Sequence, residues 1–406
     1  MKHLKNFTLA FFWWVFLIGD LKAIQTLTQS FNDSSATGVV HNSKGFEFTT
    51  PDGKYQLQIA GRLQFRFATP NDQNPLTFDD FDTEPSNIFK INRARLKIGG
   101  HAYQPWLKYY FEYEIGASRL LDFRVMFEKW PWFKVKFGQW KSEYSRERII
   151  SSGKQQMMER SIINRPFTLD RQQGVSLYGN LAGAVILNID YHLMVLTGTG
   201  LGSGNNDDDN MMYSGRLQWN FLGEGVAMSG SDLEGHSSPA ASLAWAGATN
   251  TSQYTRFSSQ GGGELVGFEE GNPGQFSVDQ HLIESTFKFR SLSWHSEFHN
   301  KKIWDHLNQK ETRLRGWFAQ GGYVINGHGF KTGKPMYEIA GRYARFRPDL
   351  DEMMNMEEEF SLALNCFFHE HFNKLSADVT FFDFDAASIN REASGWRIRI
   401  QYDFSF

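Results

Sequence analysis

Basic residues recur at even intervals in two neighbouring stretches of the sequence. One stretch carries Arg62 and Arg66, and the next carries Arg93, Arg95 and Lys97. If both stretches are extended strands, this spacing places the side chains of each on one face, with about 6–7 Å for every two residues along the strand. Arginine suits oxyanions because its planar fork donates paired hydrogen bonds to phosphate oxygens. In a narrow aqueous lumen with walls of low dielectric, such a ladder could pass an anion from site to site.

The candidate anion-binding set extends beyond these two stretches. It is completed by Arg124, Lys141, Lys154, Arg160 and Arg171. Residues 54–180 hold 20 Lys+Arg and 13 Asp+Glu, a net of +7, whereas residues 181–406 hold 18 and 28, a net of −10. The whole chain carries 42 basic and 45 acidic residues, a net of −3. We therefore expect a local basic lining in a protein that is not itself basic. The alternative remains that these bases only solvate a polar wall and pair with Glu112, Glu114, Asp122 and Glu128.

Other chemistries find less support. His295, Glu297 and His299 alternate on one strand face and could bind zinc, but polar lumen residues explain them equally well. The run Asp207–Asp209 could attract Ca²⁺, although a solvated loop is the stronger interpretation. A single cysteine, Cys366, rules out a disulfide scaffold. Without a recognisable nucleophile, P-loop or dinucleotide motif, we expect no enzyme, no cofactor and no nucleic-acid partner.

The elements that would carry the ladder follow a period of two. In residues 396–406 (WRIRIQYDFSF) the apolar residues lie on one face and the polar residues on the other, and residues 55–67 and 107–115 repeat this pattern. A soluble protein seldom ends on an apolar edge strand, whereas a closed barrel in lipid needs one at its seam. The pattern predicts a transmembrane antiparallel β-barrel of about sixteen strands, with short periplasmic turns and long external loops. The predicted long connections include 301–312, and only the connection at 223–238, which is long where a short turn is expected, breaks this alternation of lengths.

The chain organisation follows from the same features. Residues 1–23 have a positive start and a short apolar run, which predicts a secretory signal peptide. We expect a periplasmic lead segment at 24–53 and the barrel at 54–406, without a transmembrane helix. The connection at 141–171 holds seven bases and four acids and is the predicted pore-constricting loop.

Four stretches carry a resemblance to a known family. They are KGFEFTTPDGKYQLQIAGRLQFRF, FKINRARLKIGG, VKFGQWKSEYSRERIISSGKQQMMERSIINRPFTLDRQQGVSLYG and FSLALNCFFHEH. In this order they resemble signatures of the phosphate-selective porin O/P family. The resemblance implies a sixteen-stranded barrel in the bacterial outer membrane, a homotrimer, and diffusion of small anions such as phosphate. Its partners would be outer-membrane lipid and, through Phe406, the barrel-assembly machinery.

One family position departs from the pattern. In the family a lysine follows the Ser-Ser pair, but here Gly153 intervenes and Lys154 comes one place late. Whether Lys154 reaches the lumen therefore stays open. Glu159 and Arg160 are expected to tie the loop to the wall through an ion pair. A different class of function also remains open, namely an exported β-rich carbohydrate-binding or adhesion protein without a pore.

Overall fold

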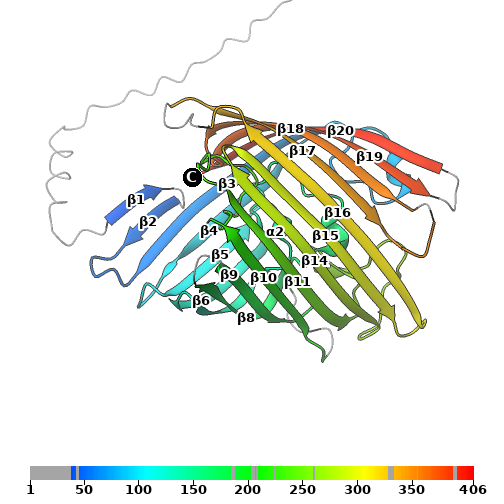
Figure 1. Cartoon of the computed structure of the whole chain (residues 1–406), viewed down its shortest axis with the longest axis horizontal. Coiled ribbons are helices and arrows are strands. Elements are labelled where there is room, and N and C mark those ends of the chain that lie inside the picture. Colours follow the sequence, from blue (N-terminus) through cyan, green and yellow to red (C-terminus); the bar gives the residue numbers. More distant parts are fainter. Residues whose placement is uncertain are drawn as a thin grey trace, which may run out of the picture.

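Sixteen strands form the barrel in the part of the chain that the structure describes. That structure is a computed structural model, and it describes residues 38–42, 45–183, 188–202, 206, 209–223, 225–258, 261–327, 333–353, 355–386 and 391–406. Each barrel strand pairs antiparallel with its neighbours in the chain, and β20 pairs with β3 to close the ring. Figure 1 shows the strands running obliquely around the barrel. The predicted sixteen-stranded barrel is confirmed.

In chain order the barrel strands are β3 (Gln56–Thr69), β4 (Ile88–His101), β5 (Leu107–Glu114), β6 (Arg119–Trp130), β7 (Phe133–Lys141), β8 (Arg171–Ala182), β9 (Asn188–Leu196), β10 (Met212–Leu222), β11 (Ala240–Ser252), β14 (Phe276–Phe289), β15 (Leu292–Asp305), β16 (Lys310–Val324), β17 (Met336–Arg347), β18 (Glu357–His369), β19 (Asn373–Ala386) and β20 (Arg391–Ser405). The loops add the short strands β12 (Arg256–Ser258) and β13 (Gly261–Gly263), the helices α2 (Arg146–Ile149) and α3 (Asn164–Phe167), and the 3₁₀ turn η1 (Phe78–Phe81). Within the described residues, no helix has the length and apolar character needed to span a membrane.

The distribution of side chains is the reverse of that in a soluble protein. On β20, Trp396 and Ile400 are 62% and 45% exposed, whereas Arg397 and Arg399, which alternate with them, are 3% and 0% exposed. The period of two puts every second residue on the outer surface and the residues between them on the inner wall. An apolar exterior around a polar interior is the arrangement that hydrocarbon selects.

The two ends of the chain meet at the barrel seam. The backbone of Phe406 exchanges two hydrogen bonds with Gly61 on β3, of 2.8 and 3.1 Å. Beyond this point β3 pairs with β2 (Gly45–Thr49), which forms a hairpin with β1 (Gly38–Asn42). This hairpin, seen in blue beside β3 in Figure 1, occupies part of the predicted lead segment. The predicted signal peptide lies outside the described residues.

The longest connections lie at one end of the barrel, as predicted, although short ones also occur there, at 115–118 and 306–309. The end that carries the loops 70–87, 142–170 and 253–275 is here called the loop end, and the opposite end the turn end. At the turn end, Arg290 and Ser291 form a two-residue hairpin with φ of 48° and 70°, as a primed turn requires. The prediction of a long connection at 301–312 was wrong. β15 continues to Asp305 and β16 starts at Lys310, so only residues 306–309 connect them. The alternation of buried and exposed side chains continues through the charged residues that had suggested a loop.

Candidate functional site

The connection between β7 and β8, residues 142–170, folds into the barrel and is here called the inner loop. The strand bounds make it one residue shorter at each end than predicted, so Lys141 and Arg171 belong to the wall. Its apolar residues Ile163 and Phe167 pack with Phe257, Phe318 and Phe346 in a buried cluster inside the barrel. Part of the lumen is therefore filled by the loop instead of water.

Carboxylates on the wall hold the inner loop by its backbone. Glu359 on β18 accepts a hydrogen bond from the backbone N–H of Ile162 at 2.8 Å. Asp378 on β19 accepts one from Met158 at 3.2 Å. The loop thus crosses the lumen and is attached to the wall opposite the strands from which it starts. Buried donors and acceptors that are paired in this way fix the position of the loop.

The predicted basic ladder lies on the inner wall formed by β3 and β4. In the strand register Arg62 faces Arg95, Gln64 faces Arg93, and Ala60 faces Lys97. The cations of the two strands therefore form one patch on neighbouring strands. The structure brings together the five ladder residues that their spacing had placed on two separate strands.

Most of the ladder cations are held by carboxylates. Arg62 pairs with Asp403 at 2.9 Å, and Arg95 pairs with Glu112 at 2.8 Å. Glu159 from the inner loop bridges two of them, at 2.7 Å from Arg66 and 3.1 Å from Arg93. Arg66 also pairs with Asp72, and Arg95 with Glu114. Glu159 thus ties the loop to the wall, as expected, but through wall arginines and not through Arg160.

Two cavities lie along the ladder. The one toward the loop end, here called the inner cavity, has a volume of about 610 Å³ and is lined by Arg66 and Arg93. The one toward the turn end has about 530 Å³ and is lined by Arg62 and Lys97. Six cations and four carboxylates line the inner cavity, a net of +2: Arg66, Lys90, Arg93, Arg148, Arg160 and Arg165 against Asp72, Asp80, Glu159 and Glu357. The ladder therefore continues from one cavity to the other.

The other predicted residues lie in different settings. Asp122 accepts from Arg171 at 2.6 Å and from Arg124 at 3.3 Å. Lys141 donates to the carbonyl oxygen of Arg148 at 3.3 Å. Arg160 donates to carbonyl oxygens within the inner loop, including that of Ile150 at 2.8 Å. Among these residues Arg160 braces the loop from inside.

Gly153, which precedes the displaced Lys154, lies against the side chain of Arg62. A Cβ at residue 153 would lie 2.4 Å from Cζ of Arg62. The guanidinium of Arg62 instead occupies this space and donates to Ser151 and Ser152 Oγ, each at 3.2 Å. Lys154 is exposed and lines a third cavity, of about 390 Å³, near the turn end. A wall arginine thus fills the space in which a side chain at residue 153 would lie.

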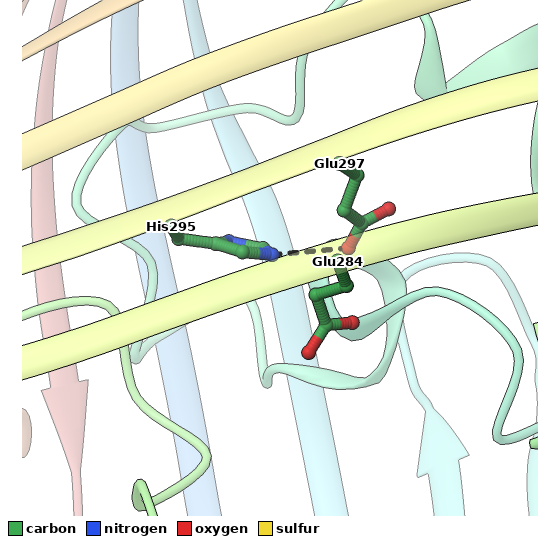
Figure 2. Close-up of side chains that lie close together, drawn as sticks. All are labelled: Glu284, His295 and Glu297. Carbon is green, nitrogen blue, oxygen red and sulfur yellow. Dashed lines mark hydrogen bonds and ion pairs between the residues drawn. The ribbon is translucent and has the colours of Figure 1, made fainter. Parts of the chain in front are cut away.

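The histidine and glutamate cluster fits an anchoring role better than a metal site. Glu284, His295 and Glu297 converge from β14 and β15 (Figure 2), and all three are buried. Glu297 accepts hydrogen bonds from His295 at 3.0 Å, from His299 at 2.8 Å and, at 2.8 Å, from Ser145 of the inner loop. The guanidinium of Arg216 donates to both oxygens of Glu284 at 2.8 and 2.9 Å. These carboxylates are already hydrogen-bonded, and a nearby guanidinium opposes a second cation.

Three of the four carboxylates of the inner loop are held in their ionised form, whereas burial raises the pKa of the fourth, Glu147. Burial alone would raise the pKa of Glu159, but the Arg93 and Arg66 guanidinium groups outweigh it and hold that pKa well below its usual range. Burial likewise opposes ionisation of Glu143, yet Lys136 lowers its pKa to about 2. For Asp170, burial is outweighed by Arg148 and Arg171, so its pKa is lowered as well. The ion pairs of the loop therefore persist at neutral pH.

Several inner-wall arginines were not among the predicted pore-lining residues, although the polar face of residues 396–406 had included Arg399. Arg216, Arg342 and Arg399 lie on inward faces, and each is paired with a carboxylate, Glu284, Glu359 and Asp378 respectively. Their alternation with apolar neighbours was the signal that could have found them. Arg146 of the inner loop, which donates to the carbonyl oxygens of Val226 and Ala227, had no such signal.

A closed sixteen-stranded barrel with an apolar exterior and a charged inner wall is the architecture of an outer-membrane porin. Residues 62–404 match the model of the family described as phosphate-selective porin O and P. The chain belongs to this family, and it is a porin of the bacterial outer membrane. Family membership favours the porin over an exported β-rich binding protein without a pore. No curated protein sequence matches the chain.

Solved porin structures share the fold. An anion-selective porin from Comamonas acidovorans is similar with a TM-score of 0.56 at 10% identity, over 87% of this chain and 100% of that one. The outer membrane channel DcaP of Acinetobacter baumannii gives a TM-score of 0.55 at 10% identity, over 88% of this chain and 99% of that one. OmpT of Vibrio cholerae in its trimer form gives 0.51 at 8% identity, over 86% and 99%. At these identities the likeness concerns the fold alone.

Proposed function

We propose that this porin prefers anions, phosphate or other oxyanions among them, and that the inner loop forms its constriction. The observation that carries the proposal is the inner cavity, where six cations outnumber four carboxylates. Its cations come from both sides, Arg66 and Arg93 from the wall and Arg148 and Arg160 from the inner loop. Between walls of low dielectric, even a small excess of positive charge raises the local concentration of anions.

The anion path would follow the ladder along β3 and β4. Arg93 lines the inner cavity, Lys97 lines the cavity at the turn end, and Arg95 lies between them in the sequence of β4. Lys97 forms no ion pair within the described part of the chain, so its charge is not cancelled by direct contact. The full set proposed to line the pore or bind anions is Arg62, Arg66, Arg93, Arg95, Lys97, Arg124, Lys141, Lys154, Arg160 and Arg171.

Assembly and targeting form part of the same proposal. The outward apolar side chains suit lipid and neighbouring subunits alike, and OmpT of Vibrio cholerae has a trimer form. We propose a homotrimer in outer-membrane lipid, a signal peptide at 1–23, a periplasmic lead segment at 24–53, and Phe406 as the contact of the barrel-assembly machinery. The proposed activity is passive diffusion, without catalysis.

The reversal potential in a salt gradient across a planar bilayer tests the anion preference. Wild type is expected to pass chloride in preference to potassium. Arg93→Glu changes the balance of the inner cavity from six against four to five against five, a change of two charge units, so this preference should fall by more than tenfold. A unit charge acts at about 10 Å with roughly 1–2 kcal/mol when the effective dielectric constant is near 20.

Arg313→Glu is the matched control, because Arg313 on β16 is exposed near the loop end and pairs with Asp351. It should leave the reversal potential unchanged. A potassium-preferring wild-type pore would overturn the proposed function. Lys97→Glu supplies a second variant, and an unchanged reversal potential in both Arg93→Glu and Lys97→Glu would remove the ladder from the permeation path.

A further inference from the structure

One connection at the turn end does not lie outside the barrel. Residues 225–238 between β10 and β11, here called the turn-end segment, fold into the lumen, and its Val226, Ser231 and Asp232 are buried. A short hairpin would suffice at this place, because Leu222 pairs with Ala241 on the neighbouring strand. The extra residues of this connection, which broke the predicted alternation of connection lengths, therefore lie inside the barrel.

The wall binds the turn-end segment through polar contacts from β14 and β17. Lys288 donates to Ser229 Oγ at 2.7 Å and to the carbonyl oxygen of Ser231 at 2.8 Å. Ser231 Oγ in turn donates to Glu338 at 2.8 Å. Both wall residues are at least 97% buried, so leaving either unpaired would be costly. These contacts fix the middle of the segment inside the barrel.

An apolar contact adds to this attachment. Leu233 packs against Val324, Met336 and Phe367. These three residues lie at the turn ends of β16, β17 and β18 and are at most 1% exposed. Apolar side chains on the lumen face of a porin would otherwise meet water. The segment thus starts at β10, crosses the lumen and covers this patch on the far strands.

The turn-end segment also contacts the inner loop directly. The backbone N–H of Gly230 donates to the carbonyl oxygen of Lys154 at 2.8 Å, and a Cβ at residue 230 would lie 2.7 Å from Cγ of Gln156. Arg146 Nη2 donates to the carbonyl oxygens of Val226 and Ala227 at 2.7 and 2.6 Å. The turn-end segment thus contacts the inner loop at two places. One is α2, near the start of the loop, and the other is the middle of the loop at Lys154 and Gln156.

Glu338 joins both segments to the same point of the wall. Its carboxylate accepts from Gln156 of the inner loop at 2.7 Å and from Ser231 of the turn-end segment at 2.8 Å. A wall residue shared in this way couples the position of one segment to that of the other. If the turn-end segment were withdrawn, the inner loop would lose Arg146 as an anchor and the support under Lys154.

We propose that the turn-end segment is the second half of the pore constriction. It closes the lumen beneath the inner loop on the β14–β18 side and holds that loop in place. The solute path is thereby narrowed toward β3–β5, where the cavity lined by Arg62 and Lys97 opens. Lys288, Glu338 and Leu233 are positioning residues for this constriction. The inference concerns pore size and does not depend on which ion the pore prefers.

Single-channel conductance of the full-length porin in planar bilayers tests this role. In the first variant Asn-Gly replaces residues 223–240, so that a two-residue turn joins Leu222 to Ala241. Conductance is expected to rise about two-fold or more, because the lumen widens and the inner loop loses a support. Leu233→Asp leaves every strand intact and should expel the segment from its apolar patch, with an increase in the same direction.

Tyr103→Asp is the matched control, since Tyr103 is 65% exposed in the short turn between β4 and β5 and does not line the cavities named above. Heat-modifiable mobility on gels reports whether each variant forms a folded barrel. A variant that only loses stability is recognised by this measurement. If either Leu233→Asp or the shortened variant forms the barrel and keeps the conductance of wild type, the proposal is overturned. The reversal potential is measured on the same channels, so loss of anion preference is distinguished from a change in pore size.

Discussion

The two cavities at the loop end of the barrel carry opposite charge. The inner cavity, deeper along β3 and β4, is lined by six cations and four carboxylates. A second cavity, here called the mouth cavity, has a volume of about 790 Å³ and is lined by residues at the loop ends of β15, β16 and β19. Its lining contains one cation, Lys310, and seven carboxylates. The seven are Glu269, Glu270, Asp305, Asp349, Glu352, Glu357 and Asp385. The two cavities share Phe268 and Glu357 in their linings, so they adjoin.

This contrast shows that net charge says little about the charge an ion meets inside a pore. The basic N-terminal part of the chain supplies the ladder and the inner loop, whereas the acidic C-terminal part places many carboxylates at the mouth. Charges at a wide, wet mouth are screened within about 10 Å at 0.1 M salt, whereas charges between protein walls are screened much less. We therefore expect the inner cavity to determine selectivity and the mouth to affect only the rate of entry.

The largest effect on ion selectivity is expected when one positive charge of the ladder is removed from the wall and then replaced by one on the inner loop. Arg62→Gln should lower the ratio of anion to cation permeability about tenfold, because the ladder loses one unit of charge. Gly153→Lys in the same chain then has room, since the Arg62 guanidinium no longer occupies the space 2.4 Å from the new Cβ. The double variant should recover most of the anion preference. Reversal potentials of the three channels in one salt gradient measure this.

Gly153→Lys alone provides the control. With Arg62 present the new Cβ would lie 2.4 Å from Cζ of Arg62, so the Arg62 side chain must move aside and give up its hydrogen bonds to Ser151 and Ser152, and the conductance should change. If the double variant is no more anion-selective than Arg62→Gln alone, charge at this place in the ladder does not determine selectivity. In that case the cavity lined by Arg62 takes no part in selectivity, which is left to the inner cavity.

The sequence was sufficient for the wall and insufficient for its interior. A period of two placed Arg62, Arg93 and Ile400 on their correct faces, because strand geometry leaves only two directions for each side chain. The partners of the ladder could not be predicted in this way. Asp403 reaches Arg62 only because the last strand closes on the first, and Glu159 reaches Arg93 only because the inner loop folds inward.

The turn-end segment illustrates the same limit. Its length was visible as an exception in the sequence, but a length does not say whether a connection lies outside the barrel or enters it. The inward signal was present in Val324, Met336 and Phe367, which are apolar at the positions that should face water. Only the register of three strands shows that these residues share one patch, and that Leu233 covers it.

A smaller effect is expected when the mouth is neutralised. Glu269, Glu270 and Glu352 are exposed in the mouth cavity, and their joint replacement by glutamine removes three of its seven carboxylates. Anion conductance should rise about two-fold at roughly 0.01 M salt, where the screening length is about 30 Å, and should not change at 1 M salt. Single-channel currents at both salt concentrations measure this, and a gain that persists at 1 M salt would show that the mouth belongs to the selective region.

The smallest expected change concerns pH and the carboxylate that joins the inner loop to the ladder. Burial would raise the pKa of Glu159, but Arg93 and Arg66 hold it well below its usual range. An acid with a lowered pKa keeps its charge and its ion pairs until the pH falls through that low value. Glu159→Gln should increase the anion preference by removing one negative charge beside the ladder. The difference in reversal potential between wild type and this variant should be the same at pH 7 and pH 5, because Glu159 is ionised at both and other titrating groups act on both channels. A difference that disappears by pH 5 would mean that Glu159 titrates in the ordinary range and is not paired with the arginines of the inner cavity.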